Sequence, residues 1–356
     1  MTEQLETTLL DVVDPMLERP LGDLGMVGDV SQKRFGKEEI QILVPVPNYP
    51  VVDELEGRIR ARIGEAPALE FVAMTDDQRA AMMSRVLEEA GPKVTESGSR
   101  TRVLMVSSGK GGVGKSSVST NLAIALHRAG KSVGVIDADI WGFSIPRMLG
   151  IDHPPVVIEQ TIIPPVAHGV KAMSMDYFVG DDQAVIWRGP MLHKAIEQFL
   201  QDVFWDTPDF LLIDTPPGTG DVSISLQQLI PRAQVLLVTT PQPTAQRVAR
   251  RAGLMAEKMN QEVIGVVENM SWFTGDDGKR YALFGEGGGQ LLADEQEVPL
   301  MAQIPLLPAM RVGADEGIPV TLAAPGSEAT EAFDTLAEAV VSRKPRVRTH
   351  PDLVIR

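Results

Sequence analysis

The feature that most constrains the fold is a glycine-rich segment between an apolar run and a helical pattern. Residues 109–116 read Gly-Lys-Gly-Gly-Val-Gly-Lys-Ser, and they lie between the apolar run at 103–106 and a helical stretch at 117–127. Backbone N–H groups of such a turn can converge on phosphate oxygens because no Cβ obstructs them, and the following helix adds a favourable dipole. The segment therefore predicts a strand–loop–helix unit that binds phosphate.

The last two residues of this segment suit a magnesium-bound triphosphate. We expect Lys115 to reach the β and γ phosphates and the Ser116 hydroxyl to ligate Mg²⁺. The nucleotide contacts predicted along the loop and the first helical turn are Gly109, Lys110, Gly111, Gly112, Val113, Gly114, Lys115, Ser116 and Ser117.

A second lysine, Lys110, lies inside the loop directly after its first glycine. Its side chain is badly placed to fold back onto the nucleotide of its own chain. In a dimeric enzyme it can instead reach the phosphates of the partner, and we expect it to act there in catalysis together with Lys115. The alternative is a solvent-exposed loop lysine, and the spacing alone does not separate the two interpretations.

Carboxylates follow two other apolar, strand-like runs. Asp137 and Asp139 come after the run at 133–136, and Asp214 follows the run at 210–213. Beside a γ phosphate, Asp139 can orient or deprotonate the attacking water, while Asp137 and Asp214 can hold the magnesium and its waters. The N–H of Gly218, four residues beyond Asp214, can sense the γ phosphate. The alternative for each aspartate is a helix N-cap.

Asn269 follows a further apolar run. A carboxamide can accept a hydrogen bond from adenine N6 and donate one to N7, which favours ATP over GTP. The alternative is an asparagine that only ends a strand.

The apolar runs alternate with helical stretches, as in an α/β domain whose mostly parallel, twisted sheet is covered on both faces. We expect this P-loop NTPase fold over residues 102–342, after a small α+β domain at 1–92 and a linker at 93–101. The small domain shows helical spacing at 5–17 and 52–63, a strand-like run from Glu39 and a helical segment at 75–89. Residues 343–356, with five basic residues and one acidic residue, are expected to form a solvated tail.

Composition excludes several classes of function. The 356 residues include no cysteine, so the chain alone offers no disulfide and no thiolate for zinc or an all-cysteine iron–sulfur cluster, and its histidines lack metal-ligand spacing. A net charge of −15 disfavours binding to nucleic acid or anionic membranes. No apolar run approaches the ~18 residues of a membrane-spanning helix, and the acidic N-terminus is unlike a secretory signal. We expect a cytoplasmic protein without nucleic-acid or membrane partners.

Together these motifs resemble the Mrp/ApbC family of ATPases, part of the deviant Walker A group with MinD, ParA and the nitrogenase iron protein. Residues 5–90 look like the small domain of iron–sulfur assembly factors. The segments that carry the ATPase resemblance are 109–116, 137–150, 187–191, 214–221, 238–242 and 268–271.

The resemblance implies a homodimer that encloses two ATP molecules, hydrolyses them slowly and carries iron–sulfur clusters, with assembly proteins or recipient apoproteins as partners. It makes Lys110 the signature lysine that reaches the other subunit, and it places Asp139 on the attacking water. Family members usually have a Cys-x-x-Cys after the Asn-Met-Ser segment, but residues 272–279 here read Trp-Phe-Thr-Gly-Asp-Asp-Gly-Lys. ATP hydrolysis thus agrees with the residues present, whereas cluster binding by this chain does not.

Three hypotheses remain. The first is a Mg²⁺-dependent ATPase that serves iron–sulfur assembly as a regulator or docking factor. The second is a ParA- or MinD-like positioning protein, which the basic tail favours and the net charge opposes. The third is a protein that binds ATP without hydrolysing it.

Overall fold

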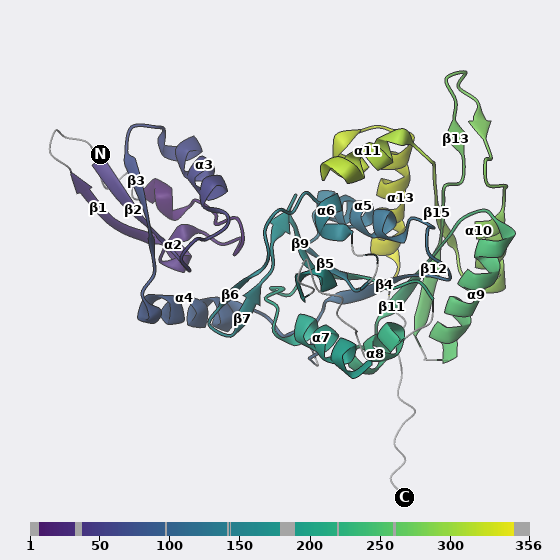
Figure 1. Ribbon diagram of the computed structural model, residues 1–356, viewed down its shortest axis with the longest axis horizontal. Coiled ribbons are helices and arrows are strands. Elements are labelled where there is room, and N and C mark those ends of the chain that lie inside the picture. The colour runs from purple at the N-terminus through teal and green to yellow at the C-terminus, as the bar shows by residue number, and fades with distance from the viewer. Residues whose placement is uncertain are drawn as a thin grey trace, which may run out of the picture. The chain divides into compact units, whose positions relative to one another are not determined.

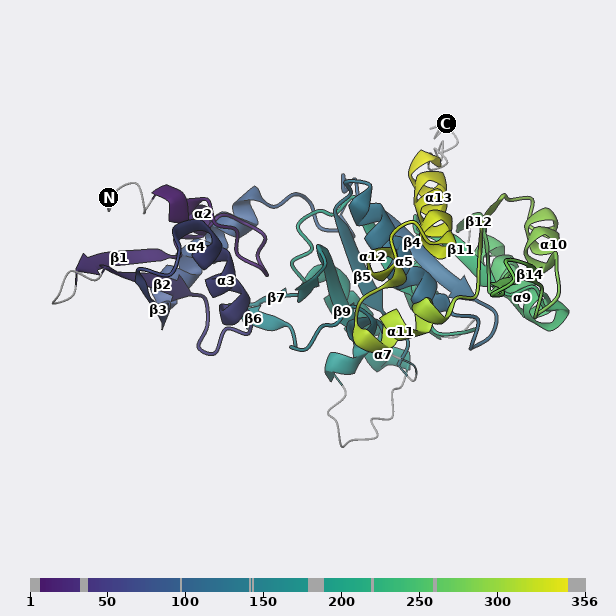
Figure 2. The same ribbon diagram turned by 90° about the horizontal axis from the view of Figure 1, so that it is seen from above.

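The computed structural model (Figures 1 and 2) describes residues 7–32, 38–96, 98–140, 142, 144–178, 189–218, 221–258 and 261–344. The chain divides into two compact units. Unit 1 contains Met1–Ser99, His153–Val166 and Leu200–Thr207, and unit 2 contains Arg100–Asp152, Ala167–Phe199 and Pro208–Arg356. The first break falls within the expected linker. The two later segments of unit 1 were expected to belong to the second domain.

Unit 1 is a small α+β unit around a three-stranded sheet in the order β1-β2-β3. Strands β1 and β2 are antiparallel, whereas β2 and β3 are parallel. The predicted helix at 52–63 is present, and Thr75 caps the last helix through a capping box with Gln78. The elements are β1 (Val27–Gln32), β2 (Glu38–Val44), β3 (Ala68–Ala73), α2 (Leu21–Leu24), α3 (Val52–Ile63), α4 (Asp76–Glu89), β6 (Val156–Ile158) and β7 (Thr161–Ile163).

The helix expected over residues 5–17 is much shorter in the structure. Only residues 7–10 are helical within the described part of this stretch. Pro15 disfavours a helical conformation at Asp14, and the Asp14 carboxylate accepts hydrogen bonds from the N–H groups of Met16 and Leu17. These side-chain hydrogen bonds replace helical ones, so the stretch has helical apolar spacing but does not form a helix after residue 10.

Unit 2 is built on an eight-stranded sheet in the order β15-β12-β11-β4-β10-β5-β9-β8. The pairings from β15 through to β9 are all parallel. Strands β5, β10 and β11 are buried along their whole length, as a sheet covered on both faces requires. The strands are β4 (Arg102–Ser108), β5 (Val133–Asp137), β8 (Val166–Ala167), β9 (Val170–Ser174), β10 (Phe210–Asp214), β11 (Gln234–Thr239), β12 (Glu262–Asn269) and β15 (Leu300–Ile304).

Helices cover both faces of this sheet. Figure 1 shows α5, α6, α11 and α13 on one face and α7 and α8 on the other. The expected α/β architecture, with a mostly parallel sheet covered on both faces, is therefore confirmed. The helical elements are α5 (Lys115–Arg128), α6 (Ile145–Met148), η1 (Met175–Phe178), α7 (Gly189–Gln201), α8 (Asp221–Leu229), α9 (Pro243–Lys258), α10 (Gly288–Glu295), α11 (Pro308–Glu316), α12 (Val320–Ala323) and α13 (Glu328–Ser342), and a hairpin is formed by β13 (Phe273–Thr274) and β14 (Arg280–Tyr281).

The buried core of unit 2 lies between the sheet and the helices that pack on it. Val118, Leu122 and Leu126 of α5 are fully buried against strand residues of β4 and β10 and against Phe333 of α13. This packing fixes α5, and with it the loop that precedes α5. None of the described helices combines the length and the apolar character that crossing a bilayer would need.

Candidate functional site

The glycine-rich loop connects β4 to α5 at the carboxyl end of the sheet. Gly112 and Gly114 both have φ of 78°, in the left-handed region that favours glycine. A Cβ on Gly114 would lie only 2.3 Å from Nδ2 of Asn269. Glycine is therefore required at position 114 both by its backbone conformation and by the side chain packed against it.

A cavity of about 340 Å³ opens over this loop. Its wall contains most of the loop together with side chains that follow β5 and β10. The lining residues are Ser108, Lys110, Gly111, Gly112, Val113, Gly114, Lys115, Ser116, Ser117, Asp139, Gly142, Ser144, Met148 and Pro217. The structure thus brings eight of the nine predicted loop contacts, all except Gly109, into one cavity with Asp139.

Lys115, Ser116 and Ser119 all direct their polar atoms at Asp214. The Lys115 ammonium lies 2.7 Å from Asp214 Oδ2, and the Ser116 hydroxyl donates to the same oxygen at 2.7 Å. Ser119 donates to Oδ1 at 2.6 Å. The carboxylate is completely buried, and these three donors compensate its charge. Ser119, one turn after Ser116, was missed in the sequence, where only its spacing within the helix could have indicated it.

Asp137 lies directly beside Asp214, because the two are paired across the parallel strands β5 and β10. Its carboxylate accepts hydrogen bonds from the N–H groups of Asp139, Ser144 and Ile145 at 2.9–3.2 Å. Burial, reinforced by the negative charge of Asp214, raises the pKa of Asp137 to about 7. Two adjacent buried carboxylates form an acidic edge suited to a hard cation such as Mg²⁺.

Asp139 lines the cavity from the loop after β5. Its Oδ1 accepts a hydrogen bond from the N–H of Gly142 at 3.2 Å. A Cβ on Gly142 would approach Asp139 Oδ2 to 3.1 Å, so a larger residue at 142 would crowd the carboxylate. The structure therefore places Asp139 at the cavity wall, apart from the buried cluster around Asp214.

Gly218 and Asn269 both contact the β4–α5 segment. The N–H of Gly218 donates to the carbonyl of Ser108 at 3.0 Å, and Gly218 has a φ of 95°. In this conformation that N–H is not directed at a phosphate. Asn269 is buried, and its Nδ2 donates to the carbonyl of Val113 at 2.8 Å. Its Oδ1 has no hydrogen-bond partner within the described part of the chain.

Lys110 is held within its own chain. Its ammonium donates to Oε1 of Gln242 at 3.2 Å, and Ser108 donates through its hydroxyl to the Lys110 carbonyl. Gln242 follows β11, at the end of a motif noted in the sequence without an assigned role. This partner was not predicted, because nothing in the spacing joins two residues so far apart in the chain.

A salt-bridged hairpin lies after the Asn-Met-Ser segment, where the resemblance noted in the sequence implies a Cys-x-x-Cys. The Arg280 guanidinium lies over the ring of Trp272, 4.2 Å from its centroid, and Trp272 donates through Nε1 to Glu328 at 2.8 Å. The hydrogen bond from Trp272 lowers the pKa of Glu328. The described residues contain no group of three or more His, Cys, Asp and Glu side chains that could hold a metal ion. With no cysteine in the chain, this region does not fit an iron–sulfur cluster.

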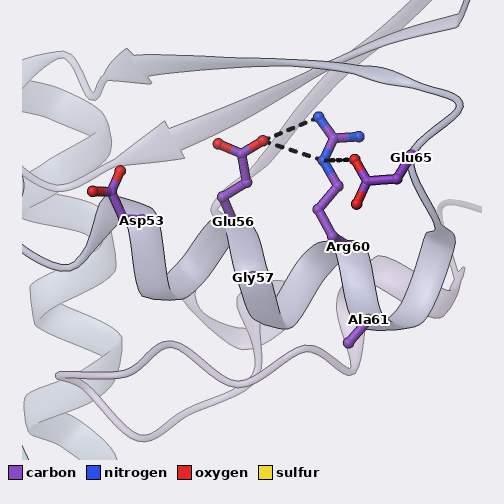
Figure 3. Close-up of a pocket in the computed structure, with 6 residues that line it drawn as sticks. All are labelled: Asp53, Glu56, Gly57, Arg60, Ala61 and Glu65. Carbon is purple, nitrogen blue, oxygen red and sulfur yellow. Dashed lines mark hydrogen bonds and ion pairs between the residues drawn. The ribbon is translucent and has the colours of Figure 1, made fainter.

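A second hollow, of about 590 Å³, runs along α3 of unit 1 (Figure 3). Its lining includes Asp53, Glu56, Arg60 and Glu65. Arg60 already pairs with Glu56 at 3.1 Å and approaches Glu65 to 3.6 Å. Because the lining carries three carboxylates and a single cation that is already paired, this hollow repels phosphate, and the cavity over the glycine-rich loop is the better nucleotide site.

Some predicted features lie outside the described residues. These are Trp187 and Arg188 of the 187–191 motif, Trp141 and Phe143 of the 137–150 motif, Thr219 and Gly220 of the 214–221 motif, and residues 345–356 of the basic tail.

Sequence comparison identifies close relatives along nearly the whole chain. Residues 99–341 match a family described as "ParA: NUBPL iron-transfer P-loop NTPase". The iron–sulfur cluster carrier protein of Mycobacterium leprae is 43% identical and the match covers 96% of this chain and 93% of the relative. The protein of the same name from Synechocystis is 36% identical, with 96% and 97% covered.

Two solved structures are similar to a large part of this chain. A nucleotide-binding protein from Archaeoglobus fulgidus in complex with ADP is 34% identical with a TM-score of 0.54, and the match covers 61% of this chain and 86% of the other. The septum site-determining protein MinD from Pyrococcus horikoshii, complexed with Mg-ADP, is 26% identical with a TM-score of 0.53 and coverage of 68% and 96%.

Proposed function

The chain belongs to the NUBPL-type family of iron-transfer P-loop NTPases, and we propose that it binds Mg²⁺–ATP over the glycine-rich loop and hydrolyses it. The observation that carries this proposal is the cavity itself. It joins the phosphate loop to Asp139 and lies above the buried cluster of Lys115, Ser116 and Asp214. The ADP complex of the Archaeoglobus relative supports the same class of ligand.

The oxygen ligands at the carboxyl ends of β5 and β10 fit magnesium. In our proposal the Ser116 hydroxyl would bind the ion, and Asp137 and Asp214 would hold it and its waters. Mg²⁺ prefers such hard oxygen ligands, and when bound it neutralises charge on the phosphates. The Ser116 hydroxyl can keep its hydrogen bond to Asp214 while a lone pair of its oxygen binds the ion. Lys115 would move from Asp214 towards the β and γ phosphates.

We assign the activation of water to Asp139. Its carboxylate lies at the cavity wall, outside the cluster of Lys115 and Asp214. From this position it can orient or deprotonate a water beside a γ phosphate. Gly218 can contact the γ phosphate only after its N–H leaves the Ser108 carbonyl, so its proposed role requires the loop after β10 to move.

The preference for ATP over GTP is assigned to Asn269. Its Oδ1 is an unused acceptor among the described residues, and an acceptor suits the amino group of adenine rather than the carbonyl of guanine. The Nδ2 group meanwhile holds the phosphate loop through Val113.

We further propose that the protein works as a homodimer in which Lys110 of each subunit reaches the phosphates bound by the other. Its cellular role would be in iron–sulfur cluster assembly, as the names of its relatives suggest. Because the chain has no cysteine, we assign it the role of a regulator or docking factor for assembly proteins or recipient apoproteins. Cysteine thiolates for the cluster would come from a partner protein.

A positioning function like that of MinD is less well supported. The structural likeness to MinD covers 68% of this chain, while the net charge of −15 opposes binding to nucleic acid or anionic lipid.

The test is ATP turnover by the purified wild type and by Asp139→Ala, with nucleotide binding measured on the same samples. We expect Asp139→Ala to bind ATP and to hydrolyse it more slowly by a factor of roughly 10² or more, as expected for loss of a general base. Unchanged turnover in Asp139→Ala would exclude the assigned role. Binding without turnover in the wild type would identify the chain as a nucleotide binder rather than an ATPase.

A further inference from the structure

The segment at residues 238–242, which follows β11, has no part in the proposed chemistry, yet it touches the phosphate loop. Strand β11 pairs in parallel with β4, and Val238 is aligned with Ser108. The chain therefore leaves β11 next to the start of the loop. There Gln242 accepts the hydrogen bond from the Lys110 ammonium at 3.2 Å, in a partly buried position.

The backbone that carries Gln242 is closely packed. Gly288, at the start of α10, lies so near Pro241 that a Cβ on it would be 2.3 Å from the Pro241 carbonyl oxygen. The next residue, Gly289, donates its N–H to the buried carboxylate of Glu268 at the end of β12. Two neighbouring elements thus fix the backbone beside Gln242, so its amide offers Lys110 a well-positioned acceptor.

We propose that Gln242 is a positioning residue that holds Lys110 within its own subunit until a second copy closes over the nucleotide, when Lys110 exchanges the amide for a phosphate of the partner. This inference rests on the proposed function, in which Lys110 acts across the dimer. The Gln242 contact stabilises the subunit before it dimerises, while Lys110 is still held within its own chain, and so the contact opposes dimer formation.

The chemistry of an amide suits a contact that must be made and released. A neutral carbonyl oxygen holds an ammonium less strongly than a carboxylate does, whereas a triphosphate is a far stronger acceptor for the same cation. A carboxylate at position 242 would compete with the phosphate for Lys110, and an apolar side chain would not hold Lys110 at all. An acidic and an apolar substitution at position 242 should therefore shift the equilibrium between monomer and nucleotide-bound dimer in opposite directions.

The resting contact can be tested without nucleotide. The rate at which an amine-reactive ester acylates Lys110 is followed by peptide mass spectrometry in wild type, Gln242→Ala and Gln242→Glu. Gln290→Ala is the matched control, because Gln290 is an exposed α10 glutamine whose side chain donates to Asp294 on the same helix. We expect Gln242→Ala to raise the rate at Lys110 several-fold and Gln242→Glu to lower it, with Gln290→Ala unchanged. Equal rates in the wild type and both Gln242 variants would show that Gln242 does not restrain Lys110, and the proposal would be wrong.

The consequence for assembly is tested by sedimentation with Mg²⁺ and a non-hydrolysable ATP analogue. We expect Gln242→Ala to lower the dimer dissociation constant about fivefold or more, and Gln242→Glu to raise it, since a hydrogen bond to a charged group is lost or strengthened in each subunit. In a Lys110→Ala background the Gln242 substitutions should have no further effect. Weaker dimerisation in Gln242→Ala, or an unchanged effect of Gln242→Ala in the Lys110→Ala background, would contradict the proposal.

Failure of the proposed function would look different. If Lys110 does not act across a dimer, Lys110→Ala will dimerise with the analogue as the wild type does, or neither will dimerise. If only the inference about Gln242 is wrong, Lys110→Ala will weaken the dimer while the Gln242 variants match the wild type.

Discussion

The ammonium of Lys115 lies 2.7 Å from the Oδ2 atom of Asp214, and the side chains are only 6% and 0% exposed. The lysine that the sequence assigns to phosphate is thus paired with the aspartate assigned to magnesium. Ser116 donates to the same carboxylate oxygen. Binding of a magnesium-bound triphosphate would therefore exchange partners within a cluster that is already formed, rather than order loose side chains.

Replacing Lys115 by methionine should destabilise unit 2 as well as abolish nucleotide binding. The substitution keeps an apolar stem but leaves the buried Asp214 carboxylate with only the two hydroxyl donors, and breaking a buried ion pair costs on the order of 3 kcal/mol. Amide hydrogen exchange in β4 and β10 under native conditions would measure the loss. Lys279→Met, at an exposed lysine, serves as the control and should change stability by less than about 0.5 kcal/mol. Equal exchange in the two variants would show that the pair contributes nothing to stability.

The raised pKa of Asp137 predicts a specific pH dependence of stability. Burial and the neighbouring Asp214 raise this pKa from 3.8 to about 7, so the folded protein holds the proton more tightly than the unfolded chain. The stability contributed by this proton is fully present below about pH 4 and is lost as the pH rises to about 7. Asp137→Asn removes this titration. For the nucleotide-free proteins, the unfolding midpoint of Asp137→Asn should therefore rise relative to that of the wild type as the pH increases from about 4 to about 7. Above that pH the difference between the two midpoints should be constant. A constant difference between the two would contradict the shifted pKa.

Asn269→Ala should weaken ATP binding more than GTP binding. Both nucleotides lose the support that Nδ2 gives to the Val113 carbonyl, but only adenine loses an acceptor for its amino group. A neutral hydrogen bond corresponds to at most about a tenfold change in affinity. Calorimetric titrations of wild type and variant with each nucleotide give the ratio. Equal losses for ATP and GTP would show that Asn269 only holds the loop.

Anaerobic reconstitution with iron and sulfide should leave this protein without a stable cluster. The chain has no cysteine, and the hairpin at Trp272 and Arg280 is closed by contacts to Glu328. Iron counting and visible absorbance after desalting provide the measurement, with a cysteine-ligated ferredoxin as the positive control. A stoichiometric cluster that survives desalting would refute the role of regulator or docking factor.

Much of the fold could be predicted because its signals are local. The apolar runs at 103–106, 133–136 and 210–213 became the buried strands β4, β5 and β10, and the segment at 75–89 became α4 with Thr75 as its cap. The helix expected over 5–17 was wrong because Asp14 and Pro15 determine the backbone there more strongly than the apolar spacing does.

The parts of the fold and of the site that could not be predicted depend on contacts between residues far apart in the sequence. No periodic pattern indicates that His153–Val166 and Leu200–Thr207 pack with the first unit. Within the site, the glycine-rich loop could be recognised from its residue order alone. The contacts of Lys110 with Gln242 and of Asn269 with Val113 could not, because they arise only when parallel strands bring their carboxyl ends together.

The most direct test of this account is isothermal titration calorimetry of the folded wild type and Lys115→Met with Mg²⁺–ATP. We predict saturable binding to the wild type at one site per chain, with the heat of binding lost in Lys115→Met. If the well-folded wild type gives no heat that saturates with ATP or ADP at several temperatures, the glycine-rich loop does not bind nucleotide and the proposed function is wrong.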